Sequence, residues 1–112
     1  MSQITTHVLD TSMGKPAEGI RAKLSFFKLQ TWNEIAEGVT NIDGRISDLI
    51  RDESILDNGI YKISFDTDSY FKKKKIEGFY PFVEIVFEID TGEHYHIPLL
   101  LSPFGYSTYR GS

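Results

Sequence analysis

Three histidines are the side chains in this sequence best suited to acid–base chemistry, because an imidazole titrates at about pH 6.5. His94 and His96 lie two residues apart in a run of strand-forming residues, so both side chains point to one face of a strand. His7 lies in the first strand-like run, where a core position would more naturally be aliphatic. By spacing alone, the three could bind zinc and leave one position open. The same pattern also fits surface or structural histidines, so the spacing is a weak signal.

Arg45 is the second candidate for chemistry, because it follows the turn residues Asp43 and Gly44 at the start of a strand-like run. A guanidinium at such a place could bind a carbonyl or an anionic heterocycle through two parallel hydrogen bonds. An arginine after a tight turn is also commonly a solvated strand start.

Residues 94–112 form the most unusual segment, since they stay rich in aromatic, hydroxyl and strand-forming residues up to the last position. Chain ends are more often polar and frayed. A strand-forming run of this kind would leave an unprotected sheet edge. We therefore expect residues 105–110 to pair with another subunit.

Apolar and polar residues alternate along most of the chain, a pattern typical of half-buried strands. Such strands would position the candidate side chains named above. Residues 83–90 show it clearly, with acidic residues at most of the outward positions. Turn residues separate the runs, and no strand alternates with a long helix. The sequence predicts an all-β sandwich of seven to eight strands. We expect the strands near residues 4–10, 20–28, 31–37, 45–50, 60–66, 82–90, 93–101 and 105–110.

Residues 66–75 break the alternation and predict one short helix. The segment begins with capping residues and ends with four lysines, and both features suit the helix dipole. The lysines could form a phosphate or membrane patch. A solvated helix end is the better interpretation, because no aromatic residue interleaves with them and the whole chain is acidic.

Composition sets the limits on function. The 112 residues predict a single domain, 1–112, and carry a formal net charge of −4. Neither a nucleic acid nor an anionic membrane is an expected partner, because both require a positive field. The absence of cysteine excludes disulfides, thiolate zinc sites and a cysteine nucleophile. No signal-peptide pattern precedes the first strand-like run, so the expected location is cytoplasmic.

Three motifs give the chain a resemblance to a known family. They are His-Val-Leu-Asp followed by Gly-Lys-Pro-Ala in residues 7–17, the segment 38–45 that ends in Asp-Gly-Arg, and residues 94–112, which close with Tyr-Arg-Gly-Ser. The chain resembles the 5-hydroxyisourate hydrolases, the enzymatic branch of the transthyretin-like proteins, along nearly its whole length. The closing motif is specific, because the hormone-carrying transthyretins lack it and also lack the histidines at the matching positions.

The resemblance implies a prealbumin-like sandwich assembled as a homotetramer of paired dimers, with sites in a channel between the dimers. It implies hydrolysis of 5-hydroxyisourate to 2-oxo-4-hydroxy-4-carboxy-5-ureidoimidazoline in urate degradation, with no metal and no other cofactor. His94 does not match a catalytic position of the family. The residues that the resemblance assigns to catalysis are His7, Arg45, His96 and Ser112, and those it assigns to substrate binding are His7, Arg45, Tyr109, Arg110 and Gly111.

The side chains themselves are consistent with this reaction. Opening a cyclic amide needs a base for water, stabilisation of the carbonyl oxygen and a proton for the leaving nitrogen. The sequence leaves open whether His7 or His96 is the base. Two other functions also stay open: a carrier of small aromatic ligands on the same fold, and a zinc hydrolase that uses His7, His94 and His96.

Overall fold

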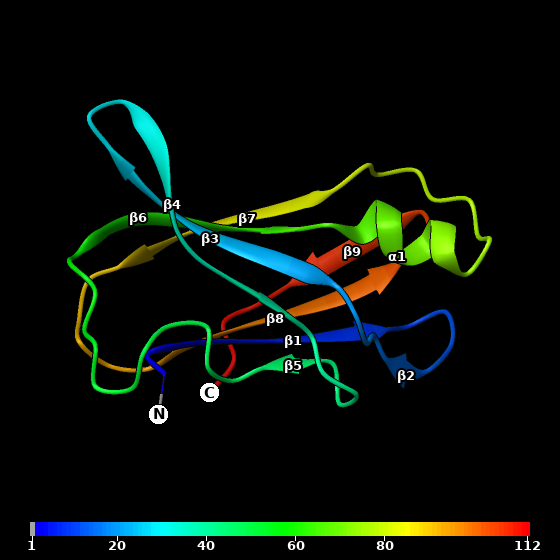
Figure 1. The fold of residues 1–112 in the computed structure, drawn as a ribbon, viewed down its shortest axis with the longest axis horizontal. Coiled ribbons are helices and arrows are strands. Elements are labelled where there is room, and N and C mark those ends of the chain that lie inside the picture. Colours follow the sequence, from blue (N-terminus) through cyan, green and yellow to red (C-terminus); the bar gives the residue numbers. More distant parts are fainter. Residues whose placement is uncertain (1) are drawn as a thin grey trace.

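Two stacked β-sheets and one short helix make up the computed structural model, which describes residues 2–112 (Figure 1). The first sheet contains β1 (Ile4–Asp10), β2 (Lys15–Pro16), β5 (Arg45–Ile46), β8 (Tyr95–Ser102) and β9 (Gly105–Thr108). The second sheet contains β3 (Arg21–Lys28), β4 (Thr31–Val39), β6 (Gly59–Phe65) and β7 (Val83–Ile89). The two layers confirm the predicted all-β sandwich.

Strand β1 is central to the first sheet. It pairs in parallel with β8 on one side and antiparallel with both β2 and β5 on the other. Strand β9 follows β8 and ends the order β2-β1-β8-β9. The second sheet has the order β4-β3-β6-β7 and is antiparallel throughout. Strands from the two ends of the chain therefore lie side by side.

The hydrophobic core fills the space between the sheets and leaves the other face of the first sheet free. Along β1, buried residues alternate with half-buried ones. Ile4 and Val8 point into the core and are fully buried, whereas Thr5 and His7 lie on the outward face. The period-two pattern of the sequence is thus the reason that the chemically useful residues of β1 share the outward face.

Two details of the strands differ from the sequence-based expectation. Nine strands are found in residues 2–112, and the additional one is the two-residue β2. The strand expected at 45–50 ends at Ile46, because the next buried residue is Leu49 and the spacing of two is lost. The backbone N–H of Ile50 donates to the Ser2 hydroxyl (3.1 Å) instead of to a neighbouring strand.

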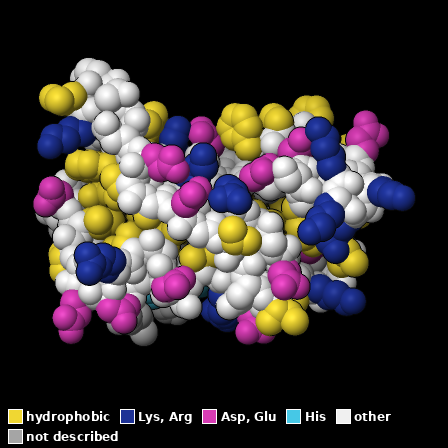
Figure 2. Space-filling view, viewed as in Figure 1, with side chains coloured by type: hydrophobic (Ala, Val, Ile, Leu, Met, Phe, Trp, Pro, Cys, Tyr) yellow, Lys and Arg dark blue, Asp and Glu magenta, His cyan; other side chains and the backbone are white. Residues whose placement is uncertain are grey.

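Helix α1 (Thr67–Lys73) lies within the predicted segment and begins as expected. Asp66 caps it, and the Asp66 carboxylate accepts a hydrogen bond from the backbone N–H of Ser69 (3.2 Å). The helix ends before Lys75, whose φ of 59° lies in the left-handed region. Lysines 72–75 are exposed, and Figure 2 shows Lys and Arg side chains gathered at the end of the molecule where α1 lies.

The described part of the chain, residues 2–112, contains no helix that is long and apolar enough to cross a membrane.

Candidate active site

Strand register brings the predicted residues together on the outward face of the first sheet. In the β1–β8 pair, Thr5 is opposite His96, and in the β1–β5 pair, His7 is opposite Arg45. Directly opposed residues have side chains close together on one face. The two pairs are neighbours along β1, so two imidazoles and one guanidinium share a small area of the sheet.

The turn before Arg45 is built tightly against β1. Gly44 has a φ of +73°, and a Cβ at this position would collide with the carbonyl oxygen of Val8. The Val8 N–H donates to the Gly44 carbonyl (2.7 Å), and the Asn41 side chain accepts a hydrogen bond from the Arg45 N–H (3.0 Å). Glycine therefore permits the close approach that places Arg45 beside His7.

A cavity of about 200 Å³ lies at this part of the sheet. Its wall includes Arg45, Ser47, His94, His96 and Ser112. His96 and His94 are half-buried, while Arg45 and Ser112 are exposed. The structure thus brings three of the four predicted catalytic residues to one cavity, and strand register places the fourth, His7, beside Arg45.

The C-terminal residues reach this cavity through a close contact with His96. The Gly111 N–H donates to the His96 carbonyl (2.9 Å), which forms an isolated bridge to β8. A Cβ at Gly111 would lie 2.5 Å from His96 Cδ2, a separation too short for any larger residue. Gly111 therefore packs against the edge of the imidazole ring, and this contact brings Ser112 to the cavity.

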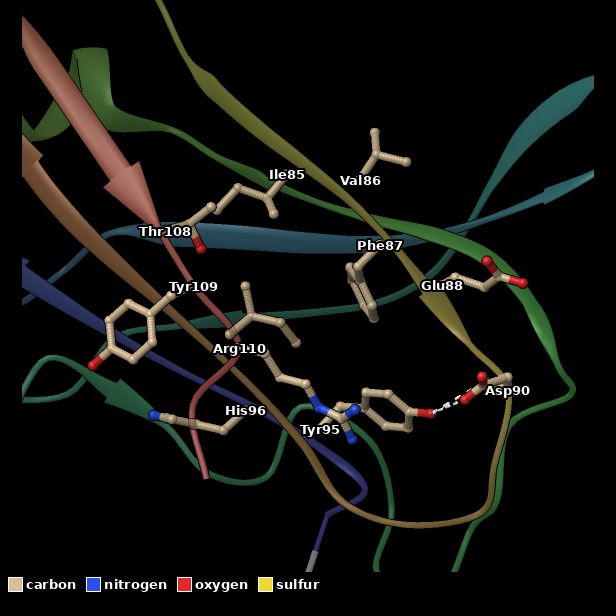
Figure 3. Close-up of a pocket in the computed structure, with 11 residues that line it drawn as sticks. Ile85, Val86, Phe87, Glu88, Asp90, Tyr95, His96, Thr108, Tyr109 and Arg110 are labelled. Atoms are coloured by element: carbon tan, nitrogen blue, oxygen red, sulfur yellow. Dashed lines mark hydrogen bonds between the residues drawn. The ribbon is translucent and has the colours of Figure 1, made fainter.

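Tyr109 and Arg110 lie at a second cavity, of about 330 Å³, rather than at the first. The Arg110 guanidinium lies over the Tyr95 ring, 4.4 Å from its centre (Figure 3). Arg110 Nη2 is also 2.7 Å from Glu93 Oε1. His96 lines both cavities. In the isolated chain, Tyr109 and Arg110 are therefore separated from Arg45 by the imidazole of His96.

The environment favours the neutral form of both predicted catalytic imidazoles. Burial lowers the pKa of His7, and the nearby Arg45 charge lowers it further, against the opposing influence of Asp43. Burial also lowers the pKa of His96, as do Arg45, His94 and His7, while a hydrogen bond to the Thr5 backbone acts in the opposite direction. A neutral imidazole is the form that accepts a proton from water.

The three histidines do not converge as a zinc site would require. Across residues 2–112, no group of three His, Asp or Glu side chains is arranged to hold a metal ion. The His94 and His96 rings are stacked with centres 6.3 Å apart, and the Thr5 hydroxyl oxygen lies 2.8 Å from a nitrogen of each. The geometry therefore does not support the zinc interpretation.

Thr5 is a cavity residue that sequence reasoning left out, and His94 is one that it considered only as a possible zinc ligand. The signal for Thr5 was its place two residues before His7, which puts both side chains on one strand face. The corresponding signal for His94 was its spacing from His96. Neither pattern reveals that one hydroxyl contacts both rings.

Comparison with known proteins gives one family and several close relatives. Residues 4–111 match the family described as the HIUase/Transthyretin family. The chain is 47% identical to the 5-hydroxyisourate hydrolase of Mus musculus, over 99% of this chain and 96% of that protein. It is 44% identical to the 5-hydroxyisourate hydrolase of Salmonella typhimurium, over 97% of this chain and 80% of that protein.

Two solved structures extend the likeness to three dimensions. The 5-hydroxyisourate hydrolase of Klebsiella pneumoniae superposes with a TM-score of 0.86 at 38% identity, covering 97% of this chain and 98% of that one. Sea bream transthyretin, solved in complex with thyroxine, gives a TM-score of 0.91 at 33% identity, covering 98% of this chain and 95% of that one. The fold is thus common to hydrolases and to a hormone-binding protein, so the site residues must separate the two functions.

Proposed function

The chain belongs to the HIUase/Transthyretin family, and from this membership we propose that it hydrolyses 5-hydroxyisourate in urate degradation. Water adds to a ring carbonyl carbon, the bond between that carbon and the ring nitrogen breaks, and the nitrogen takes up a proton. The product is 2-oxo-4-hydroxy-4-carboxy-5-ureidoimidazoline. The enzyme is therefore a cyclic amide hydrolase.

One observation carries this proposal: Arg45, His96 and Ser112 line one cavity, and His7 lies opposite Arg45 in the adjoining strand. A carrier of aromatic ligands needs an apolar channel with few charged groups. Two neutral imidazoles and a guanidinium provide what hydrolysis needs, namely a base and a permanent positive charge.

The roles of the residues follow from their chemistry. His96 or His7 accepts the proton of the attacking water. Arg45 binds the carbonyl oxygen as it becomes negative, a contribution typically worth roughly 3–4 kcal/mol. Ser112 donates or accepts a hydrogen bond to the substrate at the same cavity.

Three further residues of the C-terminal motif complete the proposed substrate site. Gly111 fixes the His96 ring by contact with its edge. Tyr109 and Arg110 bind the substrate from the neighbouring cavity, which shares the wall formed by His96.

The working assembly is proposed to be a homotetramer of paired dimers, with the sites at the interface between the dimers. Two features of the fold support it. The outward face of the first sheet presents the site residues, and β9 ends its sheet with an unpaired edge (Figure 1). The proposed location is the cytoplasm, which suits a chain without cysteine.

A turnover assay on freshly generated 5-hydroxyisourate tests the function directly. We expect the protein to accelerate the loss of the substrate's ultraviolet absorbance well beyond its spontaneous decay. His7→Asn and His96→Asn should each stay folded and lose nearly all of this acceleration. If the wild-type protein leaves the decay unchanged, the carrier function gains support, and binding of an aromatic ligand becomes the next measurement.

A further inference from the structure

The Thr5 hydroxyl lies between two imidazoles of the proposed site. Thr5 Oγ1 is 2.8 Å from His94 Nε2 and 2.8 Å from His96 Nδ1. Both distances are within the range of normal hydrogen bonds. Thr5 is half-buried on the outward face of β1, and its Cα pairs directly with that of His96 across the sheet. The contact is thus set by strand register.

A threonine hydroxyl has one proton to donate, so the two hydrogen bonds cannot have the same direction. If Thr5 donates to His94, the Nδ1 of His96 must carry a proton and donate to Thr5. If Thr5 donates to His96, the proton of the neutral His96 ring must lie on Nε2. The direction of this chain of hydrogen bonds therefore decides which nitrogen of His96 is free to accept a proton.

The surroundings favour the first direction. A hydrogen bond to the Thr5 backbone acts to raise the pKa of His96, as an acceptor next to a ring N–H does. Burial, the charge of Arg45 and the neighbouring His94 and His7 rings lower the pKa of His96 and so favour the neutral ring. Its Nδ1 is the nitrogen that lies 2.8 Å from Thr5 Oγ1, so a proton there has an acceptor in place. Gly111 packs against Cδ2 and fixes the ring orientation.

We propose that Thr5 and His94 are positioning residues that set the tautomer of His96, with His96 Nδ1–H donating to Thr5 Oγ1 and Thr5 Oγ1–H donating to His94 Nε2. This inference rests on the proposed hydrolase function and assigns the base role to His96 Nε2. When Nε2 accepts a proton from water, the resulting imidazolium keeps its hydrogen bond to Thr5. The chain of hydrogen bonds therefore stabilises the charged intermediate without a change in geometry.

The central test compares Thr5→Val with Thr5→Ser. Valine keeps the size of the side chain and removes the hydroxyl, whereas serine keeps the hydroxyl. We expect Thr5→Val to lose about 10–100-fold in kcat with little change in KM, which is the range for removal of a partner that orients a functional histidine. Thr5→Ser should recover most of the loss. Equal kcat values for Thr5→Val and the wild-type protein would overturn the proposal.

Nitrogen NMR of the histidine side chains reports the tautomer without any substrate. In the wild-type protein, His96 Nδ1 should show the shift of a protonated nitrogen and Nε2 that of a bare one. Thr5→Val should move His96 toward the other tautomer, and His94→Phe should move it in the same direction. A proton on His96 Nε2 in the wild-type protein would overturn the proposal. Nitrogen shifts of His96 that neither variant changes would overturn it as well.

Thr11→Val is the matched control for loss of a threonine hydroxyl, at a residue in the turn that follows β1. The Thr11 hydroxyl donates to the Leu101 carbonyl (3.1 Å) just beyond the end of β1 and does not line the cavity. Its kcat and the His96 signals should both match those of the wild-type protein. Because NMR reads the hydrogen bonds directly, a wild-type protein without turnover would count against the hydrolase function and not against the tautomer.

Discussion

Arg45 offers the sharpest test at the level of single residues. Arg45→Lys keeps the charge and should still lower kcat/KM by about a hundredfold, the loss typical when an oxyanion donor is removed. The reason is that a point charge cannot reproduce two parallel hydrogen bonds. Arg21→Lys is the control, since Arg21 is an exposed residue paired with Glu37 on the other sheet. Near-normal kcat/KM for Arg45→Lys would show that the paired hydrogen bonds of the guanidinium are unimportant at this position.

The pH dependence of the reaction follows from the lowered pKa values of His7 and His96. Both imidazoles hold their protons less tightly than the ordinary value of 6.5 implies, so they stay neutral to lower pH. We expect kcat/KM to be constant near neutrality and to fall as the pH drops, with a midpoint below 6.5. The measurement is a profile of kcat/KM against pH. A midpoint above 6.5 would contradict the proposed environment of the base.

Sequence reasoning selected candidate side chains that the fold brings close together, but it did not reveal the hydrogen bonds between them. Alternation along the strands was sufficient to place His7 and His96 on strand faces, and the turn before Arg45 selected that residue as a candidate, which the resemblance to the family also named. The link through Thr5 depends on the register between two segments that lie 91 residues apart. Sequence periodicity holds no information about that register, which only the folded sheet determines.

At the level of elements, a buried carboxylate connects the end of β1 to helix α1. Asp10 is fully buried and accepts a hydrogen bond from the Tyr70 hydroxyl (2.7 Å) and from Ser12 and Met13. Burial alone would raise the pKa of Asp10, but the hydrogen bonds outweigh it and hold the pKa below 3.8. The ionised form therefore stabilises the fold above pH 3.8, and this contribution is lost as the pH falls through the lowered pKa.

Tyr70→Phe should weaken this connection. Loss of one hydrogen bond to a charged group costs about 1.5–3 kcal/mol of the free energy of unfolding. The Asp10 pKa should rise, so acid unfolding should begin at a higher pH than in the wild-type protein. Urea unfolding at neutral and acid pH measures both effects. Tyr80→Phe should leave stability nearly unchanged, because the Tyr80 hydroxyl has no hydrogen bond to the residues that the structure describes.

The strand that the sequence patterns did not predict is too short to show any alternation. Strand β2 has two residues, and both are exposed, so no alternation could reveal it. It exists because Leu9 and Asp10 on β1 provide partners for Pro16 and Lys15. The longer strands have enough residues for periodicity to be read and were predicted to within a few residues.

At the level of the whole molecule, removal of the C-terminal residues tests whether the proposed catalysis and the proposed assembly depend on different segments. Deletion of residues 109–112 removes Ser112 from the cavity and Gly111 from the His96 ring. Turnover should be lost, whereas β9 (Gly105–Thr108) remains available for the proposed pairing between subunits. We therefore expect a tetramer by sedimentation that has no activity.

Two other results of that experiment would change the interpretation. Dissociation of the shortened chain would make residues 109–112 an assembly element. Full activity in an intact tetramer would remove them from both roles. A tag after Ser112 provides a second version of the test, because it keeps every residue and obstructs the cavity only.

The parallel pairing of β1 with β8 joins the two ends of the chain, and we expect it to form late in folding. The second sheet uses only strands between Arg21 and Ile89, so it can form from a continuous middle part of the chain. The seven-residue pairing of β1 with β8 can form only after β8 is present. The segment that connects these two strands spans most of the chain, so bringing them together is slow. We therefore expect the proposed site, which needs residues of both β1 and β8, to form only once this ladder has formed. Recovery of turnover after refolding should therefore be the last step, later than recovery of β-structure.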